Sequence, residues 1–166
     1  MRHLIAILLQ NEAGALTRVT GLISTRGYNI ESLSVAPTND PTVSRVTLVT
    51  IGSDHVIAQI NAQLLKLVDV VAVDDMTGGD TLARELLLIK LQLNAGHVED
   101  VNTLLRRMGG RVLSTNPSSY IVELTSTEME IGEFIANVAA FGEVVEVVRS
   151  GVLGMSRANP RLHAVK

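Results

Sequence analysis

The sequence predicts an α+β fold in which the order strand, helix, strand, strand, helix, strand occurs twice along the chain. Apolar runs typical of strands alternate with segments whose apolar residues recur every three or four positions, as on one face of a helix. The same order of patterns is found in both halves of the 166 residues, and a polar stretch with two glycines separates them. A chain of this length fits one ordinary domain or two small ones, and the repeated order favours two.

The first strand and helix are expected on either side of a polar loop. Residues 4–9 are all apolar, and the polar, glycine-bearing segment Gln10–Gly14 ends this strand. From Ala15 the apolar residues are spaced for one face of a helix, which Gly27 stops.

A hairpin, a second helix and a fourth strand complete the first half. Residues 28–36 and 43–51 have strand composition, and Pro37–Pro41 between them favours a turn because proline fixes φ and Asn and Asp bond to nearby backbone. Helical spacing runs from Ile57 to Leu67, and residues 69–73 form a short strand.

The second half repeats this order after a linker marked by residues 76–81. Its strands are expected at residues 85–93, 111–115, 120–125 and 143–148, and its helices at residues 98–108 and 129–141. The two halves are thus predicted to form tandem ferredoxin-like βαββαβ domains. Each is expected to have two helices on one face of a four-stranded antiparallel sheet. The expected boundaries are a first domain at 1–76, a linker at 77–82, a second domain at 83–155 and a tail at 156–166.

The composition indicates more apolar surface than two small domains bury alone. The chain is 46% hydrophobic with two Phe, two Tyr and no Trp, so nearly all of this surface is aliphatic. Residues 4–9 are apolar at both alternating sets of positions, but the helices of one domain cover a single face. Cover from a second protomer, another domain or another subunit is expected; alternatively, the sister domain of the same chain shields this strand.

Composition also excludes several classes of function. With no Cys, the chain has no disulfide, thiolate nucleophile, zinc–thiolate site or iron–sulfur ligation. A net charge of −3 and four aromatic residues argue against a nucleic-acid partner. Residues 4–9 are far shorter than the roughly 20 apolar residues of a membrane span, and a cytoplasmic location is expected.

The titratable residues give no sign of a catalytic or metal centre. His3, His55, His97 and His163 are scattered and lack metal-ligand spacing, and no nucleotide-binding, hydrolase or zinc-protease motif occurs. The acid pairs at 74–75 and 99–100 are typical of solvated ends of strands or helices. We therefore expect no catalytic residue and no metal ligand.

The loop that joins the first strand to the first helix is the strongest candidate for a ligand site. The N-terminus of a helix offers free N–H groups and a positive dipole end, and Gly14 lets backbone approach a carboxylate closely. The Asn11 amide has donors and an acceptor, which suits the ammonium and carboxylate of an amino acid. Alternatively, Asn11 and Gly14 serve only the turn and the helix cap.

A second candidate is Asn29, a weak strand former at the entry of the second strand. If two protomers pair through edge strands, Asn29 of one copy approaches the Asn11 loop of the other and closes a pocket at the interface. Leu16 and Ile30 then favour a ligand with a branched apolar side chain. The alternative is that Asn29 is only a turn residue.

Several segments in fixed order carry a resemblance to a known family. They are residues 11–19 (NEAGALTRV), 26–33 (RGYNIESL), 37–41 (PTNDP) with Ser44–Arg45, then 84–86 (REL), Pro117–Ser118, Tyr120 and 149–151 (RSG). Together the segments resemble the small regulatory subunit of acetolactate synthase, also called acetohydroxyacid synthase. The resemblance spans nearly the whole chain. Met155 and Ala158 depart from it, because the family's tail more often has Leu and Gly there.

The resemblance implies a non-catalytic subunit whose N-terminal ACT domain binds an effector and forms a homodimer. Such a subunit activates a catalytic large subunit of branched-chain amino-acid biosynthesis and confers feedback inhibition, typically by valine. Thiamine diphosphate, magnesium and FAD belong to that partner. The effector lies between two ACT domains, and the matching positions are Asn11, Gly14, Ala15 and Leu16 of one protomer with Asn29 and Ile30 of the other.

Two other functions remain open from the residues alone. One is a free-standing ACT-like amino-acid sensor with a different partner. The other is a small ferredoxin-like enzyme that uses the Asn11 loop as an anion site and His3 or His55 as a base. Arg157, Arg161 and Lys166 are expected in a solvated tail.

Overall fold

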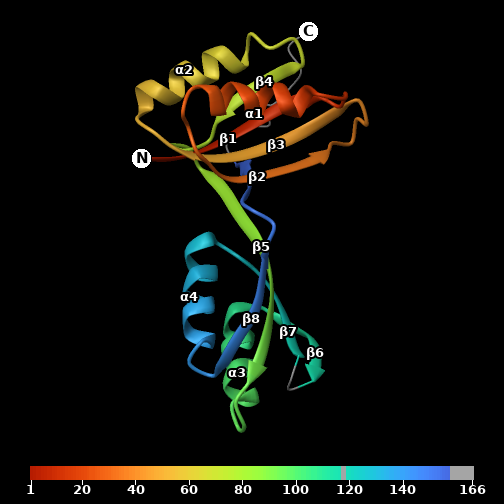
Figure 1. The fold of residues 1–166 in the computed structure, drawn as a ribbon, viewed down its shortest axis with the longest axis vertical. Helices are drawn as coiled ribbons and strands as arrows, with labels where there is room; N and C mark the ends of the chain where they lie inside the picture. Colours follow the sequence, from red (N-terminus) through yellow and green to blue (C-terminus); the bar gives the residue numbers. More distant parts are fainter. Residues whose placement is uncertain (117–118, 158–166) are drawn as a thin grey trace. The chain divides into compact units, whose positions relative to one another are not determined.

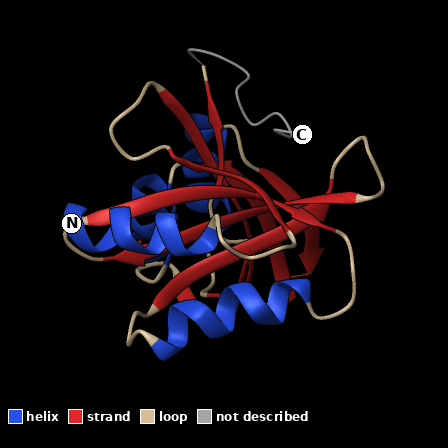
Figure 2. Ribbon diagram, turned by 90° about the horizontal axis from the view of Figure 1, so that it is seen from above, coloured by secondary structure: helices blue, strands red, loops and turns tan. Residues whose placement is uncertain are grey.

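The computed structural model describes residues 1–116 and 119–157, and these residues form two compact units. Among the described residues, the first unit contains residues 1–83 and 152–157, and the second contains residues 84–116 and 119–151. Each unit has an antiparallel sheet with two helices on one face, as Figure 1 and Figure 2 show. The predicted α+β class is confirmed. Outside the described residues lie Pro117, Ser118, Ala158, Arg161, His163 and Lys166.

The first unit has the predicted order of elements. They are β1 (Arg2–Gln10), α1 (Ala15–Thr25), β2 (Ile30–Pro37), β3 (Val43–Ile51), α2 (Asp54–Leu64) and β4 (Val70–Asp75). The sheet order is β2-β3-β1-β4, and all neighbouring strands are antiparallel. β1 pairs with β3 in continuous register from Arg2 opposite Ile51 to Gln10 opposite Val43. β1 therefore lies inside the sheet, and β2 forms one edge.

The face of this sheet that carries α1 and α2 holds the main core of the first unit. Ile5, Ile7 and Leu9 alternate along β1 and lie on this face, because successive side chains of a strand point to opposite sides. They pack with Val46, Leu48, Ala15, Val19, Ile23, Ile57, Ile60 and Leu64. Burying each Leu, Ile or Val side chain contributes roughly 1.5–3 kcal/mol.

The opposite face of the sheet is also buried along β1. Leu4 and Ala6 pack there with Val49 and Met76, and Val152, only 4% exposed, completes this cluster. The second apolar face of β1 is thus covered in part by the segment that follows the second unit. The expected boundaries assigned Val152 to the sister domain, whereas in the structure it groups with the first unit.

The second unit repeats the topology. Its elements are β5 (Thr81–Leu93), α3 (Val98–Met108), β6 (Arg111–Asn116), β7 (Ser119–Ser126), α4 (Glu128–Val138) and β8 (Gly142–Arg149), and β9 (Leu153–Ser156) follows. The sheet order is β6-β7-β5-β8, and β9 pairs with β5. Leu87, Ile89 and Leu91 of β5 pack against α3 and α4 side chains such as Leu105 and Phe134.

The limits of the second unit differ from the expected boundaries. Val152 and β9 belong to the first unit, whereas the second domain was expected to extend to residue 155. β5 begins inside the expected linker at 77–82. Arg157, expected in a solvated tail, donates its backbone N–H to the Asp80 carbonyl oxygen at 2.8 Å. β9 forms by pairing with β5, which lies much earlier in the sequence. The local sequence of β9 has no pattern that predicts a strand.

Helix ends follow capping rather than apolar spacing alone. The Ser53 hydroxyl accepts the Val56 N–H, so α2 begins before its first buried residue. α2 and α4 end at Leu64 and Val138, three residues before the ends predicted at Leu67 and Phe141. A capping box between Thr127 and Glu130 opens α4, and hydrogen bonds from Ser126 and Thr127 lower the pKa of Glu130 to about 2.

Two glycines of the second unit are expected to respond oppositely to alanine. A Cβ at Gly142 would lie 2.3 Å from the Gln92 carbonyl oxygen, so Gly142→Ala requires backbone movement and costs about 1–3 kcal/mol. Gly132 lies inside α4 with nothing within 4 Å of an added Cβ, so Gly132→Ala stabilises by roughly 0.5–1 kcal/mol. Thermal unfolding followed by circular dichroism measures both, and shifts in the same direction contradict this account.

Candidate functional site

The loop between β1 and α1 is fixed to the β2–β3 hairpin through Asn11. The Asn11 backbone N–H donates to the Thr42 carbonyl oxygen at 2.8 Å, and its side-chain amide donates to the Pro41 carbonyl oxygen at 3.0 Å. Asn11 is exposed, and one hydrogen bond leaves its amide with a further N–H group and the carbonyl oxygen. The side chain therefore both holds the turn and presents polar groups to solvent.

Gly14 sets the backbone at the start of α1. It is the N-cap residue with φ of +84°, a conformation that glycine adopts without a Cβ penalty. A Cβ there would lie 3.2 Å from the Arg18 guanidinium. Within the described residues no side chain caps this helix, so the first-turn N–H groups of Leu16 and Thr17 have no intrahelical acceptor. The loop thus has the free N–H groups that an anionic ligand needs.

An ion pair that the sequence patterns do not indicate supports this loop. Arg18 of α1 donates through Nε to the carboxylate of Asp69, which is only 4% exposed. This hydrogen bond lowers the pKa of Asp69 below its ordinary value and raises the pKa of Arg18. The Asp69 carbonyl oxygen also accepts the Gln10 N–H at 2.8 Å. Asp69 therefore ties together the end of β1 and the first turn of α1.

Asn29 and Ile30 lie at the start of β2. Asn29 is exposed, and its carbonyl oxygen accepts the Thr50 hydroxyl at 2.7 Å. Ile30 is half-buried against the core of the first unit and pairs with Thr50. Asn29 thus directly precedes an edge strand, and it lies outside the apolar core.

The structure does not bring the two groups of predicted residues together within one chain. β1 and β2 both run antiparallel to β3 and are therefore parallel to each other. Asn11 lies beside Thr42 at one end of β3, and Ile30 lies beside Thr50 near the other end. The separation along an extended strand is about 27 Å. Ala15 and Leu16 stay with Asn11 and Gly14 because they open α1.

A second copy, if it paired antiparallel through the outer edge of β2, would remove this separation. In a two-fold antiparallel pair, the start of one β2 lies level with the end of the other. The end of β2 is the end of the sheet that carries the Asn11 loop. Both groups then lie at the same level along the joint sheet.

His3 lies at the opposite end of β1 from this loop. His3 is buried, and among the described residues neither of its ring nitrogens has a hydrogen-bond partner. These nitrogens lie 3.5 and 3.6 Å from carboxylate oxygens of Asp54 and Asp75. In residues 1–116 and 119–157 no group of three or more His, Cys, Asp and Glu side chains is arranged to hold a metal ion.

The other residues singled out in the sequence have local roles. His55 bonds to Gln59, and His97 to Asp100. Glu99 pairs with Arg106 along α3. Searching the described residues for a helix of the length and hydropathy that a bilayer crossing requires finds none.

Comparison with known proteins identifies the class of this arrangement. A family described as the AHAS small subunit-like ACT domain matches residues 5–72, and one described as the small subunit of acetolactate synthase matches residues 84–158. The fold and the β1–α1 loop thus define an ACT domain followed by a second βαββαβ unit.

Full-length relatives specify the family. The acetolactate synthase isozyme 3 small subunit of Escherichia coli is 45% identical over 96% of this chain and 98% of the relative. The acetolactate synthase small subunit of Haemophilus influenzae is 38% identical over 98% of this chain and 99% of its own. The crystal structure of the small subunit from Thermotoga maritima matches with a TM-score of 0.86 at 29% identity, covering 96% of this chain and 99% of that one. The chain belongs to the acetolactate synthase small subunit family.

Asp69→Asn is expected to lower the melting temperature at neutral pH, because the amide replaces a charged acceptor for Arg18. A carboxylate with a lowered folded-state pKa stabilises the fold above the unfolded-state pKa of about 3.9, and loses this effect as the pH falls through the folded-state value. The difference in melting temperature between variant and wild type therefore narrows below about pH 4.

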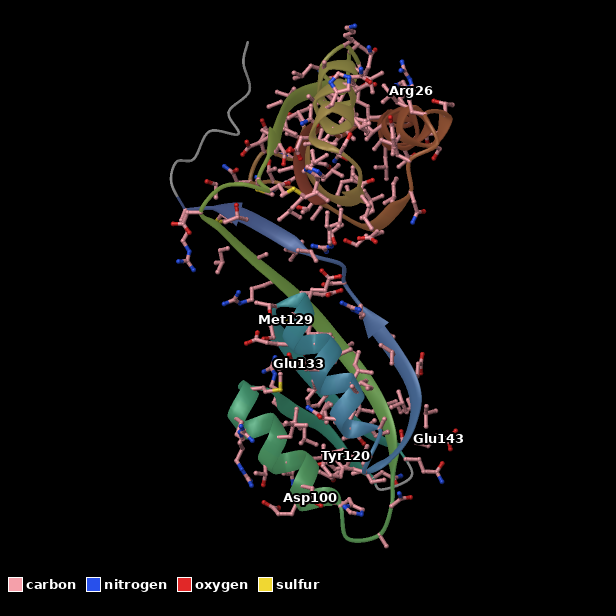
Figure 3. All side chains as sticks on the ribbon, turned by 90° about the vertical axis from the view of Figure 1, so that its left-hand side faces the viewer. Arg26, Asp100, Tyr120, Met129, Glu133 and Glu143 are labelled. Carbon is pink, nitrogen blue, oxygen red and sulfur yellow. The ribbon has the colours of Figure 1, made fainter. Side chains whose placement is uncertain are left out.

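Glu133→Gln is the matched control, since Glu133 is an exposed acid on α4 (Figure 3). Its melting curves are expected to follow the wild type at each pH. A gap between the Asp69→Asn and wild-type curves that stays constant from pH 7 to pH 3 contradicts the assigned role of the Asp69 charge.

Proposed function

We propose that this chain is the regulatory subunit of an acetolactate synthase and has no catalytic residues of its own. It binds a catalytic large subunit, activates it and makes it sensitive to valine in branched-chain amino-acid biosynthesis. The observation that carries this proposal is the family membership, which extends over nearly the entire chain. Thiamine diphosphate, magnesium and FAD are assigned to the catalytic partner, and the complex to the cytoplasm.

The proposed effector site lies at the seam between two ACT domains. The first-turn N–H groups behind Gly14 bind the effector carboxylate, and the Asn11 amide orients its ammonium and carboxylate groups. Asn29 of the second copy closes the pocket. Leu16 and Ile30, both half-buried, contact the branched side chain. One methylene in such a pocket changes affinity by about 1–3 kcal/mol, so leucine and isoleucine compete with valine.

Regulation requires that valine bind one state of the holoenzyme better than the other. A ligand of equal affinity for both states shifts nothing. A coupling free energy of about 1–3 kcal/mol changes the apparent affinity by roughly 5- to 150-fold, which is sufficient for feedback control. The dimer of ACT domains supplies the two-state element, because the pocket changes whenever the two sheets shift along their shared edge.

Asn11→Ala is expected to raise the valine concentration for half-maximal inhibition about tenfold or more, since a hydrogen bond to a charged group contributes about 1.5–3 kcal/mol. Acetolactate formation by the reconstituted holoenzyme measures this value. Asn94→Ala, at an exposed asparagine in the β5–α3 loop, is the matched control. Gly14→Asp adds a negative charge and a strained φ at the same loop, and is expected to weaken valine inhibition more than Asn11→Ala does. Valine inhibition curves of Asn11→Ala and Gly14→Asp that overlay the wild-type curve refute the site.

Val35→Glu is expected to convert the dimer into monomers and to abolish valine binding. Val35 is 43% exposed on the edge strand β2, where a second copy would pair. Val68→Glu is the control, because Val68 is 83% exposed between α2 and β4, away from that edge. Analytical ultracentrifugation reads the mass of each variant. A Val35→Glu variant that remains dimeric places the dimer interface elsewhere.

A further inference from the structure

The segment after the second unit returns to the first sheet and packs on the face that lacks helices. We call residues 152–157 the strap. Val152 is buried in the cluster of Leu4, Ala6, Val49 and Met76, and β9 of the strap pairs with β5. A Cβ at Gly154 would lie 2.7 Å from the Met76 Cε and 2.8 Å from a Leu4 Cδ atom. A larger residue at this position therefore has to displace the ends of the Met76 and Leu4 side chains.

Polar contacts attach the strap at defined points. The Arg45 guanidinium donates to the Gly154 carbonyl oxygen at 2.8 Å, and the Val152 N–H donates to the Ser32 hydroxyl at 3.5 Å. Arg45 is half-buried, and this burial lowers its pKa, although Arg remains charged. A partly buried guanidinium needs acceptors, and the strap provides one. Docking of the strap and burial of Arg45 therefore support each other.

These attachment points lie close to the proposed effector residues along two strands. Arg45 follows Thr42 by three residues on β3, and the Thr42 carbonyl accepts the Asn11 N–H. Ser32 follows Asn29 by three residues on β2. Three residues of strand span about 10 Å. The strap thus bonds to both strands whose ends carry the two halves of the proposed site.

The chain on the other side of the strap is also held firmly. Arg149 donates two hydrogen bonds to Glu85, a carboxylate only 4% exposed, and the Ser150 N–H donates to the Leu86 carbonyl oxygen at 3.0 Å. Gly151 has a φ of +75° and directly precedes Val152. Gly151 is thus the covalent connection between the fixed end of β8 and the strap.

We propose that the strap is the coupling element of this subunit. Binding of an effector at the ends of β2 and β3 changes the hydrogen bonds of Ser32 and Arg45 to the strap. Val152 transmits that change to the second unit through Gly151. The inference rests on the proposed regulatory function, and it adds the path by which effector binding to the ACT domain affects the second unit. Arg45 and Gly154 are positioning residues, because neither touches the proposed pocket.

The test uses Arg45→Leu and Gly154→Val in the holoenzyme reconstituted with its catalytic subunit. Hydrogen exchange of residues 152–157 reports docking of the strap, calorimetry reports valine binding, and acetolactate formation reports inhibition. Both variants are expected to lose exchange protection in the strap and to bind valine within about threefold of wild type. Their inhibition is expected to weaken at least about fivefold, the lower end of allosteric couplings.

Arg45→Lys keeps the charge and one donor, and is expected to restore part of the inhibition. Arg106→Leu removes an exposed arginine of α3 that pairs with Glu99, and is expected to match the wild type in all three measurements. Where Gly154→Val unfolds the first unit, the Arg45 pair of variants decides the question, because Arg45 is not one of the buried apolar residues of this cluster, which it contacts at the Met76 sulfur at 3.7 Å.

If variants that lose exchange protection in the strap are still inhibited by valine like the wild type, the coupling role is wrong and the proposed function stands. A wild-type holoenzyme that neither binds valine nor responds to it refutes the proposed function itself, and the coupling role with it. The two failures are thus separated by the wild-type measurement.

Discussion

The first unit depends on β1, a strand that is apolar and buried on both faces. On one face Ile5, Ile7 and Leu9 meet α1 and α2, which follow from the local order of the chain. On the other face Leu4 and Ala6 meet Val152, which the chain reaches only after traversing the second unit. Because an interior strand without cover exposes apolar surface to water, the first unit is complete only when the strap has docked. The fold thereby makes one unit depend on a segment beyond the other.

Sheet topology imposes the second constraint. The βαββαβ order makes β1 and β2 parallel, so the loop after β1 and the residues before β2 occupy opposite ends of the sheet. A pocket that uses both Asn11 and Asn29 therefore needs two chains. In the dimer proposed above, pairing along the outer edge of β2 would align them. Family membership is the reason to expect such a pocket. The strand register is the reason to propose that the pocket lies between two protomers.

The sequence predicts elements whose signals are local. α3 has the predicted bounds because helical spacing continues to its last residue, and β3 has the bounds predicted from its strand composition. Contacts between distant residues escaped prediction. Arg18 and Asp69 are 51 residues apart, and β9 is a short segment containing Gly154 that becomes a strand only through pairing. The candidate residues Asn11 and Gly14 emerged from helix-terminus chemistry, and their joint use with Asn29 was inferred from pairing of edge strands between two protomers, which the family resemblance also implies.

Mixing two singly substituted chains tests the two-chain pocket most directly. Asn11→Ala and Asn29→Ala homodimers each have only damaged pockets, but a mixed dimer has one pocket with both asparagines intact and one with neither. After unfolding and refolding of an equal mixture, calorimetry is predicted to find wild-type affinity for valine at about a quarter of the sites, since half of the dimers are mixed. A mixture in which no high-affinity site appears contradicts the account, because a pocket within one chain is damaged in every protomer.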